Sequence, residues 1–356
     1  MTMSAMPELL LEKHVRYFHR LLGILPSQFQ SADSNKLVII YFALNGLDIL
    51  NKLDTVKIPE RELLIKRIYE NYLVLPGGEG FRGSETYNLG ENKSSSSYNY
   101  DPPNLAATFI ALSILFILKD SSIVQRLDRD KIMKYVQRCQ IQDGSFKPIL
   151  NLDGKPFGDS DLRYSMIAAT IRKFLKYDKG DNNDIDLKLL EASIISRKSY
   201  DGGFGSEVFT ESHGGLTYCG ISTLKLINRI EGKSWDKTID FLIHRQISFT
   251  EYNKKELEYE FNDIDDIGGF NGRLNKYGDT CYAFWCLGSL KILSDEFVKF
   301  VDFTELEKYL LNKTQNKIMG GFNKTSDEDE IPDPFHSFMG IITLSIINDE
   351  KSRNDG

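Results

Sequence analysis

The sequence lacks a long uninterrupted apolar run, a signal peptide and a polybasic segment. Its longest apolar stretch, roughly Leu105 to Leu118, is interrupted by Thr108 and Ser113, as is typical of a buried helix rather than of a membrane span. The N-terminus turns amphipathic and charged without an apolar h-region or a small-residue cleavage site. We therefore expect a cytoplasmic protein that is neither secreted nor an integral membrane protein.

Cysteine and basic residues are also too sparse for two further classes of protein. Four cysteines in 356 residues do not form a disulfide framework, which indicates reduced thiols. The net charge of −7 and the absence of basic runs give no nucleic-acid footprint. Any phosphate-bearing partner must therefore be held by a local basic cluster.

A repeated unit accounts for the length of the chain, which exceeds the usual limit for one hydrophobic core. Five Gly-rich steps end in phenylalanine, at Phe81, Phe146, Phe204, Phe270 and Phe322. Apolar segments with a small central residue recur at Ala43, Ala111, Ala168, Gly220, Cys286 and Gly340. These centres are 68, 57, 52, 66 and 54 positions apart, which indicates a supersecondary repeat with loop insertions.

The stretches between these segments alternate with them in character. Apolar residues recur at three- and four-residue spacing, as in exposed helices, within residues 58–75, 130–140, 187–198, 235–246 and 303–315. The small-centred segments are apolar nearly all round, as buried helices are. We therefore predict an all-α fold of about six helical hairpins, each with an outer helix, a Gly-Phe turn and an inner helix. Periodicity does not decide between an open solenoid and a closed ring.

Two polar segments interrupt the repeat, at residues 84–103 and 326–333. Their low complexity or high charge predicts mobile loops. We expect the whole chain, residues 1–356, to form a single domain around these loops.

The reactive side chains gather near one end of the inner helices. Counted back from the centre of its own segment, each lies four to seven positions before it: Arg163, His213, Asp279, Cys281 and His336. Parallel inner helices would bring these residues to one rim, where the helix dipoles favour an anion.

Asp279, Cys281 and His336 form a candidate zinc site. The first two can converge only where a loop becomes a helix, because residues two apart on a helix face away from each other. His336, one repeat later, supplies a third ligand and leaves a fourth position open, as catalytic zinc sites do. The alternative is a capping aspartate, a buried cysteine and a core histidine.

Phosphate-binding candidates come from the same rim. His213 precedes two glycines that allow close approach of a ligand, and the pair Arg273 and Lys276 could clamp phosphate oxygens. Alternatively, His213 is an ordinary loop histidine and the pair is a solvated charged surface. Several aromatics are either plain core or the wall of an elongated apolar pocket: Tyr164, Tyr218, Phe284, Trp285 and Phe338.

These motifs together resemble the β subunits of the protein prenyltransferases, and among them most closely the type I geranylgeranyl enzymes. The resemblance covers nearly the whole chain and rests on QIQDGSF, SYDGGFG, ESHGGLTYCGI, GRLNKYGDTCYAFW and DPFHSF. It implies an α–α toroid that pairs with a separate helical α subunit.

The resemblance also implies roles for individual residues. It makes Asp279, Cys281 and His336 the zinc ligands. The implied diphosphate-binding group is His213, Arg273, Lys276 and Tyr282. The residues implied along the lipid pocket are Arg163, Cys219 and Trp285. The implied reaction transfers a C20 isoprenoid from geranylgeranyl diphosphate to the cysteine of a C-terminal CaaX motif with X leucine, in proteins such as Rho-type small GTPases.

At a few positions the sequence differs from the patterns of this family. These differences affect the expected lipid length, the magnesium requirement and the pocket for residue X of the protein substrate. Val38 stands where the farnesyl enzyme carries tryptophan, which leaves room for a longer lipid. Lys324 replaces a magnesium-associated aspartate, so magnesium is not expected to be required, although a carboxylate among Asp327, Asp329 and Asp333 could still recruit it. Phe335 and Asn104 depart from the geranylgeranyl pattern near the expected pocket for X.

Three other functions are compatible with the same motifs. Two are enzymes, a farnesyltransferase β subunit and a Rab-type geranylgeranyltransferase β subunit. The third is a non-catalytic helical-repeat scaffold, which predicts that zinc is absent.

Overall fold

The computed structural model describes residues 8–23, 25, 27–74, 79–85, 102–177, 183–248 and 263–354. The inner helices are α2 (Lys36–Ile49), α4 (Leu105–Ile117), α7 (Leu162–Phe174), α9 (Gly214–Leu226), α11 (Thr280–Leu293) and α13 (Pro334–Asn354). The outer helices are α1 (Leu11–Leu22), α3 (Ile58–Arg67), α6 (Arg129–Cys139), α8 (Leu187–Ser196), α10 (Asp236–Ile243) and α12 (Phe303–Lys308). Between them lie α5 (Ile123–Arg126) and the antiparallel pair β1 (Ile149–Leu150) and β2 (Pro156–Phe157).

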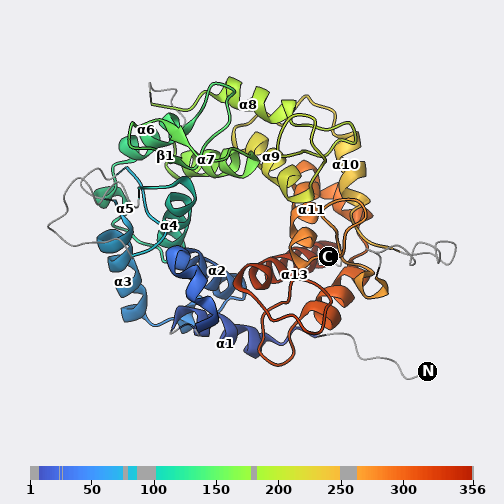
Figure 1. Ribbon diagram of the computed structural model, residues 1–356. Helices are drawn as coiled ribbons and strands as arrows, with labels where there is room; N and C mark the ends of the chain where they lie inside the picture. The colour runs from blue at the N-terminus through green and yellow to red at the C-terminus, as the bar shows by residue number, and fades with distance from the viewer. Residues whose placement is uncertain are drawn as a thin grey trace, which may run out of the picture.

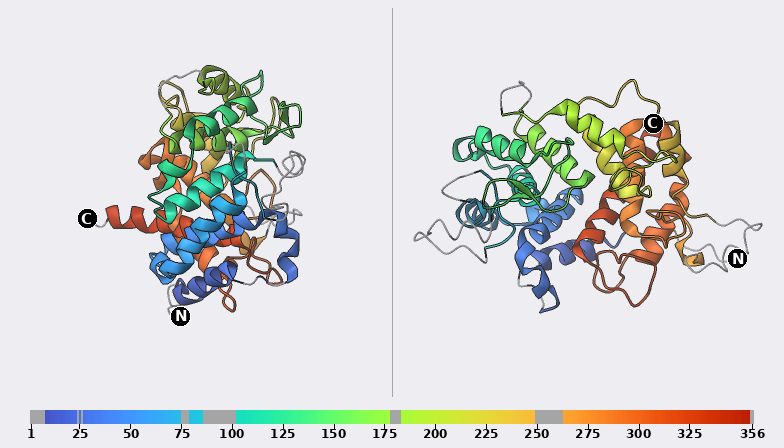
Figure 2. Two further views of the ribbon diagram at one scale, coloured as in Figure 1. Left: turned by 90° about the vertical axis from the view of Figure 1, so that its left-hand side faces the viewer. Right: turned by 45° about the horizontal axis from the view of Figure 1, so that its top comes forward.

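The inner helices close into a ring. Each contacts the next along the chain, and α13 contacts α2, so the first and last repeats meet (Figure 1). The neighbouring inner helices α11 and α13 run parallel, since they approach each other at their starts through Asp279 and His336 and farther along through Lys291 and Glu350. The closed ring decides the alternative that periodicity left open and confirms the predicted α–α toroid. The C-terminal end of α13 projects beyond the ring (Figure 2).

The two sequence signatures of the repeat pack against each other. Every Gly-Phe phenylalanine is fully buried and forms an isolated β-bridge with the end of its own outer helix. A Cβ atom at Gly340 would lie 2.7 Å from the Phe322 ring, and one at Gly220 would lie 3.2 Å from the Phe204 ring. The inner helices therefore carry small central residues because the phenylalanine of the same repeat occupies that space.

Neighbouring repeats are joined in the same way around the outside of the ring. The glycine at the turn has a positive φ, and its backbone abuts the first turn of the next outer helix. A Cβ at Gly268 would lie 2.3 Å from the Glu305 carbonyl oxygen on α12, and one at Gly320 would lie 2.2 Å from that of Lys13 on α1. The last repeat thus joins the first through the contact that joins its predecessors.

A glutamine at the end of the outer helix completes several of these joints. The Gln246 amide donates to the carbonyl of Asp302 at 2.9 Å and accepts from its N–H at 2.9 Å. Gln140 binds Asp186 in the same two-way manner. Gln315 accepts from Leu10 N–H at 2.8 Å, at the start of α1. The closure of the ring is therefore specified by hydrogen bonds as well as by packing.

The start of nearly every inner helix carries a side-chain cap, which places polar groups along one rim. The capping side chains accept backbone N–H groups of the first helical turn and belong to Asn104, Asp161, His213, Asp279 and Asp333.

The two segments expected to be mobile loops have different outcomes. Most of 84–103 lies outside the described residues. Residues 326–333 form a loop. The N–H of Thr325, directly before the loop, donates to Glu330 at 2.7 Å, and Asp333 forms an isolated β-bridge with Phe322. Mobility of both stays a prediction. Among the described helices, none is both long and apolar enough to cross a membrane.

Candidate active site

The structure brings Asp279, Cys281 and His336 together at the rim. One ligand atom from each lies within 4.8 Å of the others, and all three residues are buried. Asp279 is the N-cap of α11 and accepts the N–H of Cys281 at 2.8 Å, so these two residues lie at the loop-to-helix junction that the sequence predicts. His336 comes from the first turn of α13.

Asp333 orients the His336 ring. It caps α13 through the N–H groups of Phe335 and His336, both at 2.9 Å, and its other oxygen lies 2.5 Å from His336 Nδ1. The opposite nitrogen, Nε2, lies 3.3 Å from Asp279 Oδ1. A carboxylate behind a histidine that faces other ligands is the arrangement that fixes metal-binding histidines in proteins.

The charges of this cluster are strongly coupled. Burial opposes protonation of His336, but hydrogen bonds with Asp279 and Asp333 raise its pKa to about 9. Burial alone would raise the pKa of Asp279, yet the bonds from His336 and Cys281 hold it below its ordinary value. Burial and the nearby Asp279 carboxylate raise the pKa of the Cys281 thiol. A cation among the three groups would reverse that last effect, because it favours the thiolate.

His213 and Tyr282 form a second polar pair, on the neighbouring helices α9 and α11. His213 Nδ1 accepts the N–H groups of Gly215 and Leu216, at 3.1 and 3.3 Å, which assigns the ring proton to Nε2. Nε2 lies 2.9 Å from the Tyr282 hydroxyl. Burial, with the positive charges of Arg273 and Arg163, lowers the pKa of His213, so the imidazole is neutral and donates to the Tyr282 oxygen.

Two predicted cations lie near this pair, and each has a carboxylate partner. Arg273 lies 3.2 Å from Glu211, and Arg163, at the start of α7, lies 2.5 Å from Asp161. Both guanidinium groups are exposed, so an incoming anion can reach them, although only 12% of the Asp161 side chain is exposed and it holds Arg163 through two guanidinium nitrogens.

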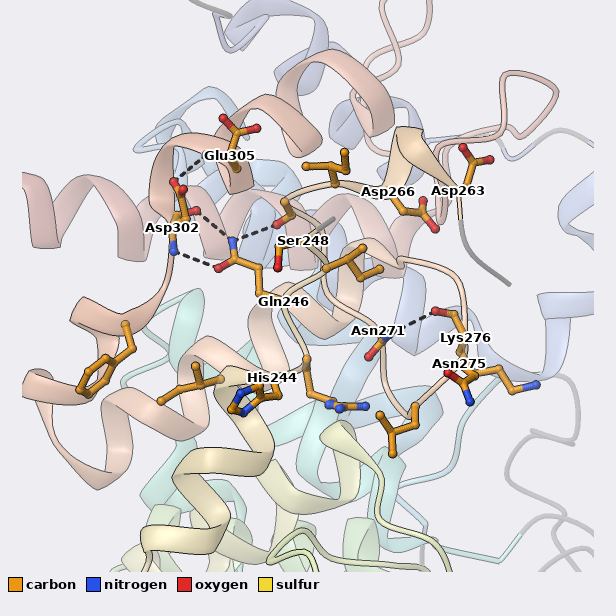
Figure 3. A pocket seen from close by; sticks show the side chains of 17 residues that line it. His244, Gln246, Ser248, Asp263, Asp266, Asn271, Asn275, Lys276, Asp302 and Glu305 are labelled. Carbon is orange, nitrogen blue, oxygen red and sulfur yellow. Dashed lines mark hydrogen bonds between the residues drawn. The ribbon is translucent and has the colours of Figure 1, made fainter. Parts of the chain in front are cut away.

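Lys276, a third predicted cation, borders a cavity of the structure. Its carbonyl accepts from Asn271 at 3.3 Å, and the residue lines a cavity of about 610 Å³ together with Gln246, Asp266 and Asp302 (Figure 3). The predicted role of Lys276 in binding a diphosphate stays a prediction.

An apolar cluster separate from the main core is centred on Cys281, Phe284, Phe338 and Met339 on α11 and α13. Partly buried aromatics pack against it, including Trp285, whose ring centre lies 4.9 Å from Tyr218 and 6.4 Å from Phe335. The cluster therefore borders the candidate ligands directly.

Cys219 and Val38 lie on other inner helices. Burial raises the pKa of the Cys219 thiol to about 12, which makes it a neutral apolar group. Val38 is half-buried on α2 and packs against the main core. The lipid contacts predicted for both residues stay predictions.

The role of Asp333 beside His336 was missed from the sequence, where this residue was considered only as part of an acidic insertion. The signal is nevertheless local. An aspartate three residues before a histidine, at the start of an apolar helix, can cap the helix and reach the histidine ring in the same turn.

Comparisons with known proteins agree with this geometry. A family model described as the prenyltransferase alpha-alpha toroid domain matches residues 9–355. The chain is 31% identical to the geranylgeranyl transferase type-1 subunit beta of Arabidopsis thaliana, over 95% of the chain and 85% of the relative. It is 30% identical to the subunit of the same name in Dictyostelium discoideum, over 95% and 90%.

A solved structure gives the same result at the level of the fold. The Candida albicans protein geranylgeranyltransferase-I complexed with GGPP superposes with a TM-score of 0.87 and 40% identity, covering 97% of the chain and 93% of its counterpart. The resemblance inferred from the motifs, the toroid fold and the enzyme class of prenyltransferase are thereby confirmed.

Proposed function

The chain belongs to the prenyltransferase α–α toroid family, and from that membership we propose that it is the catalytic β subunit of a zinc-dependent protein geranylgeranyltransferase. It works as one toroidal domain with a separate α subunit, in the cytoplasm. The reaction moves a C20 isoprenoid from geranylgeranyl diphosphate to the cysteine of a C-terminal CaaX motif. The observation that carries the proposal is the buried cluster of Asp279, Cys281 and His336 beside the inner-face aromatics.

The donor set of this cluster suits zinc. Carboxylate oxygen, thiolate sulfur and imidazole nitrogen are its usual ligands, and ligand atoms about 2.1 Å from a tetrahedral ion lie about 3.4 Å apart. Asp279 Oδ1 and His336 Nε2 are 3.3 Å apart, which matches that spacing. A bound zinc ion would supply a Lewis acid that keeps the thiol of the substrate cysteine deprotonated at neutral pH.

The neighbouring polar pair suits a departing diphosphate. Because His213 donates to the Tyr282 oxygen, the phenolic O–H is left to donate to a ligand. The exposed guanidinium groups of Arg273 and Arg163 can bind phosphate oxygens in addition to their carboxylate partners. Together these groups stabilise the charge that develops on the leaving group.

The inner-face aromatics suit the isoprenoid. The rings of Tyr218, Phe284 and Trp285 pack against one another in tilted or edge-on orientations, with ring centres 4.9 to 5.1 Å apart, beside the candidate ligands. An apolar chain held against them would keep its reactive carbon close to the substrate sulfur. Val38 leaves space for the longer lipid, and Cys219 adds a neutral apolar surface.

Lys324 supports activity without magnesium. Its backbone carbonyl accepts the N–H of Thr280 at 2.8 Å, which fixes this residue beside the start of α11. An ammonium group there takes over part of the charge that magnesium would neutralise. Turnover in a magnesium-free, chelator-buffered medium tests this arrangement, and a steep magnesium requirement contradicts it.

A matrix of peptides and lipids tests the proposal as a whole. The chain is co-expressed with a candidate α subunit, and farnesyl and geranylgeranyl diphosphate compete for CaaX peptides ending in leucine, serine or methionine. We expect stoichiometric zinc, preference for the C20 lipid and preference for leucine at X. Preference for the C15 lipid would support the farnesyl alternative, and a complex without zinc or transferase activity would support the scaffold.

A further inference from the structure

Asp266 is a buried carboxylate that the proposed mechanism does not use. It ends the short 3₁₀ helix η6 (Ile264–Asp266) and is 1% exposed. Figure 3 shows it at one side of the cavity that Lys276 also lines. Within the described part of the chain it has no salt-bridge partner, and burial raises its pKa. A buried carboxylate without a cation is costly, so its retention calls for an explanation.

The two oxygens of Asp266 hold two separate segments of chain. Oδ2 accepts the N–H of Gly278 at 2.6 Å, and Oδ1 accepts the hydroxyl of Ser326 at 2.9 Å. Gly278 directly precedes Asp279, and Ser326 begins the loop that leads to Asp333 and His336. One carboxylate thus connects both pieces of chain that carry the ligand cluster.

Close packing around Gly278 leaves little space between its backbone and the Asp266 carboxylate. A Cβ atom at Gly278 would lie 3.0 Å from Asp266 Cγ and 3.1 Å from the Tyr309 hydroxyl. The backbone before Asp279 therefore lies directly against the carboxylate. Thr280 links the same two segments through its N–H and its hydroxyl, which donate to the carbonyls of Lys324 and Asn323, each at 2.8 Å. Asp266 adds a side-chain link that substitution can remove.

The preceding repeat has a similar tether that leads to a different residue. Asp201 accepts the Ser212 hydroxyl and the N–H of Gly203, the latter at 3.1 Å. Ser212 directly precedes the cap residue His213, just as Gly278 directly precedes Asp279. Asp201 therefore offers a matched control, because it supports the polar pair of His213 and Tyr282 and not the metal cluster.

We propose that Asp266 is a positioning residue for the metal cluster. It sets the spacing between the Asp279–Cys281 pair and His336 by holding Gly278 and Ser326 on one carboxylate. This inference rests on the proposed function, because it takes the three residues to be zinc ligands.

Metal binding by the purified complex tests the inference without relying on activity. Zinc affinity is measured by competition with a chromophoric chelator, and the geometry of the site by the absorption spectrum of the cobalt-substituted complex. Removing an outer-shell partner costs metal sites about 10-fold to 100-fold in affinity, and we expect Asp266→Ala to lie near the lower value, with altered cobalt bands. Asp266→Asn keeps both contacts, because its amide oxygen can accept the Gly278 N–H and its amide nitrogen can donate to the Ser326 hydroxyl, so its zinc affinity stays within about 2-fold of wild type.

Two further variants separate positioning from general destabilisation. Ser326→Ala removes only the hydrogen bond between Ser326 and Asp266 and should weaken zinc binding by about 3-fold, because one hydrogen bond is lost. Asp201→Ala should leave zinc affinity unchanged and raise KM for the lipid diphosphate. If Asp266→Ala does not fold, Ser326→Ala decides the matter.

The outcomes distinguish the inference from the function on which it rests. A wild-type complex without stoichiometric zinc overturns both. A zinc-loaded wild type with Asp266→Ala affinity and cobalt bands unchanged overturns the inference alone. Equal losses of zinc affinity in Asp266→Ala and Asp201→Ala likewise overturn it, because the effect would then be general.

Discussion

Two sets of equivalent positions in the repeats differ in how far their residues vary. The outer joints, where a Gly-Phe turn contacts the next outer helix, keep the same residues, whereas the rim, formed by the starts of the inner helices, carries different ones. At the joints, the same chemistry recurs from repeat to repeat: a glycine with positive φ abuts the next outer helix, and a glutamine at three of the joints binds its first turn. At the rim, the equivalent cap positions carry asparagine, aspartate or histidine. The repeated contacts therefore belong to the fold, whereas the varied cap positions include the residues proposed for the active site.

The rim achieves this without giving up its structural role. Asp279 still caps α11, and His213 still caps α9, while each also faces a group on a neighbouring helix. A residue can therefore be both an ordinary cap and a candidate ligand, so the two interpretations weighed from the sequence do not exclude each other.

Substitution of Cys281, at the rim, is expected to have the largest effect on zinc binding and turnover. Cys281→Ala removes a proposed zinc ligand and should lower zinc affinity and turnover by more than the roughly 100-fold that loss of an outer-shell partner costs. In zinc-free buffer the unfolding midpoint should change little, because the joints are intact and no bound metal stabilises either protein. Zinc analysis, turnover and urea denaturation of the complex check this.

The control for that change lies on the same helix. Cys286→Ala alters a buried cysteine five positions later, at the small-residue centre of the repeat. It should leave zinc stoichiometry unchanged. Equal zinc loss in both variants would contradict the assignment of Cys281 as a ligand.

The next largest effect comes from breaking a joint. Gly320 has a φ of 74° and its Cβ would meet the Lys13 carbonyl, whereas Gly232 has a φ of 75° with open space around it. Gly232→Ala should cost about 1 kcal/mol, the price of the left-handed conformation alone. Gly320→Ala should cost at least about 3 kcal/mol, since strain and a backbone clash combine.

Urea midpoints of the two variants give the comparison. Zinc stoichiometry of the folded Gly320→Ala complex should stay at the wild-type value, because the added Cβ meets Lys13 on α1 and not a ligand residue. Equal destabilisation of both variants would show that the joint contributes nothing beyond its backbone angle.

The same division explains what the sequence can and cannot predict. The hairpins, the parallel rim and the meeting of Asp279, Cys281 and His336 follow from a register counted from small residues. That register has a physical basis, because Gly220 and Gly340 are small where the phenylalanine of their own repeat packs. Hydrophobic periodicity and packing thus determine these features within one repeat.

Contacts between repeats could not be predicted in this way. Ring closure depends on Gln315 reaching Leu10 and His14 across about 300 residues of chain, which periodicity does not encode. Asp266 was not considered, because its partners Gly278 and Ser326 belong to different segments. Sequence spacing and the family resemblance both pair Lys276 with Arg273, and that role stays a prediction; in the structure Lys276 lines the cavity that Asp266 also lines.

A substitution with a smaller expected effect separates the role of the polar pair His213 and Tyr282 from that of the metal cluster. Tyr282→Phe removes the donor expected to stabilise the departing diphosphate and should lower kcat by about 100-fold, as loss of one such donor does. Zinc affinity should not change.

A double-mutant cycle with His213→Gln extends this test. If the histidine acts by orienting the tyrosine hydroxyl, the two losses are strongly non-additive. Additive losses would show that His213 contacts the diphosphate independently of Tyr282. Steady-state kinetics with the lipid varied provide both values.

The smallest effect concerns the closing joint and its dependence on pH. His14 is fully buried, stacks on Phe322 at 5.0 Å, accepts the Gly321 N–H at Nδ1 and binds Gln315 through Nε2. Burial lowers its pKa, although the bond with Gln315 partly opposes this. Below about pH 6.5 the unfolded chain therefore binds a proton at His14 that the folded chain does not bind. The free energy of unfolding falls as pH falls, by at most about 1.4 kcal/mol per pH unit.

Comparing urea midpoints of wild type and His14→Gln between pH 8 and pH 5.5 isolates this contribution, because the other titrating groups are common to both. The wild type should lose more stability over that range, and parallel curves would show that the closing joint tolerates a charged imidazole.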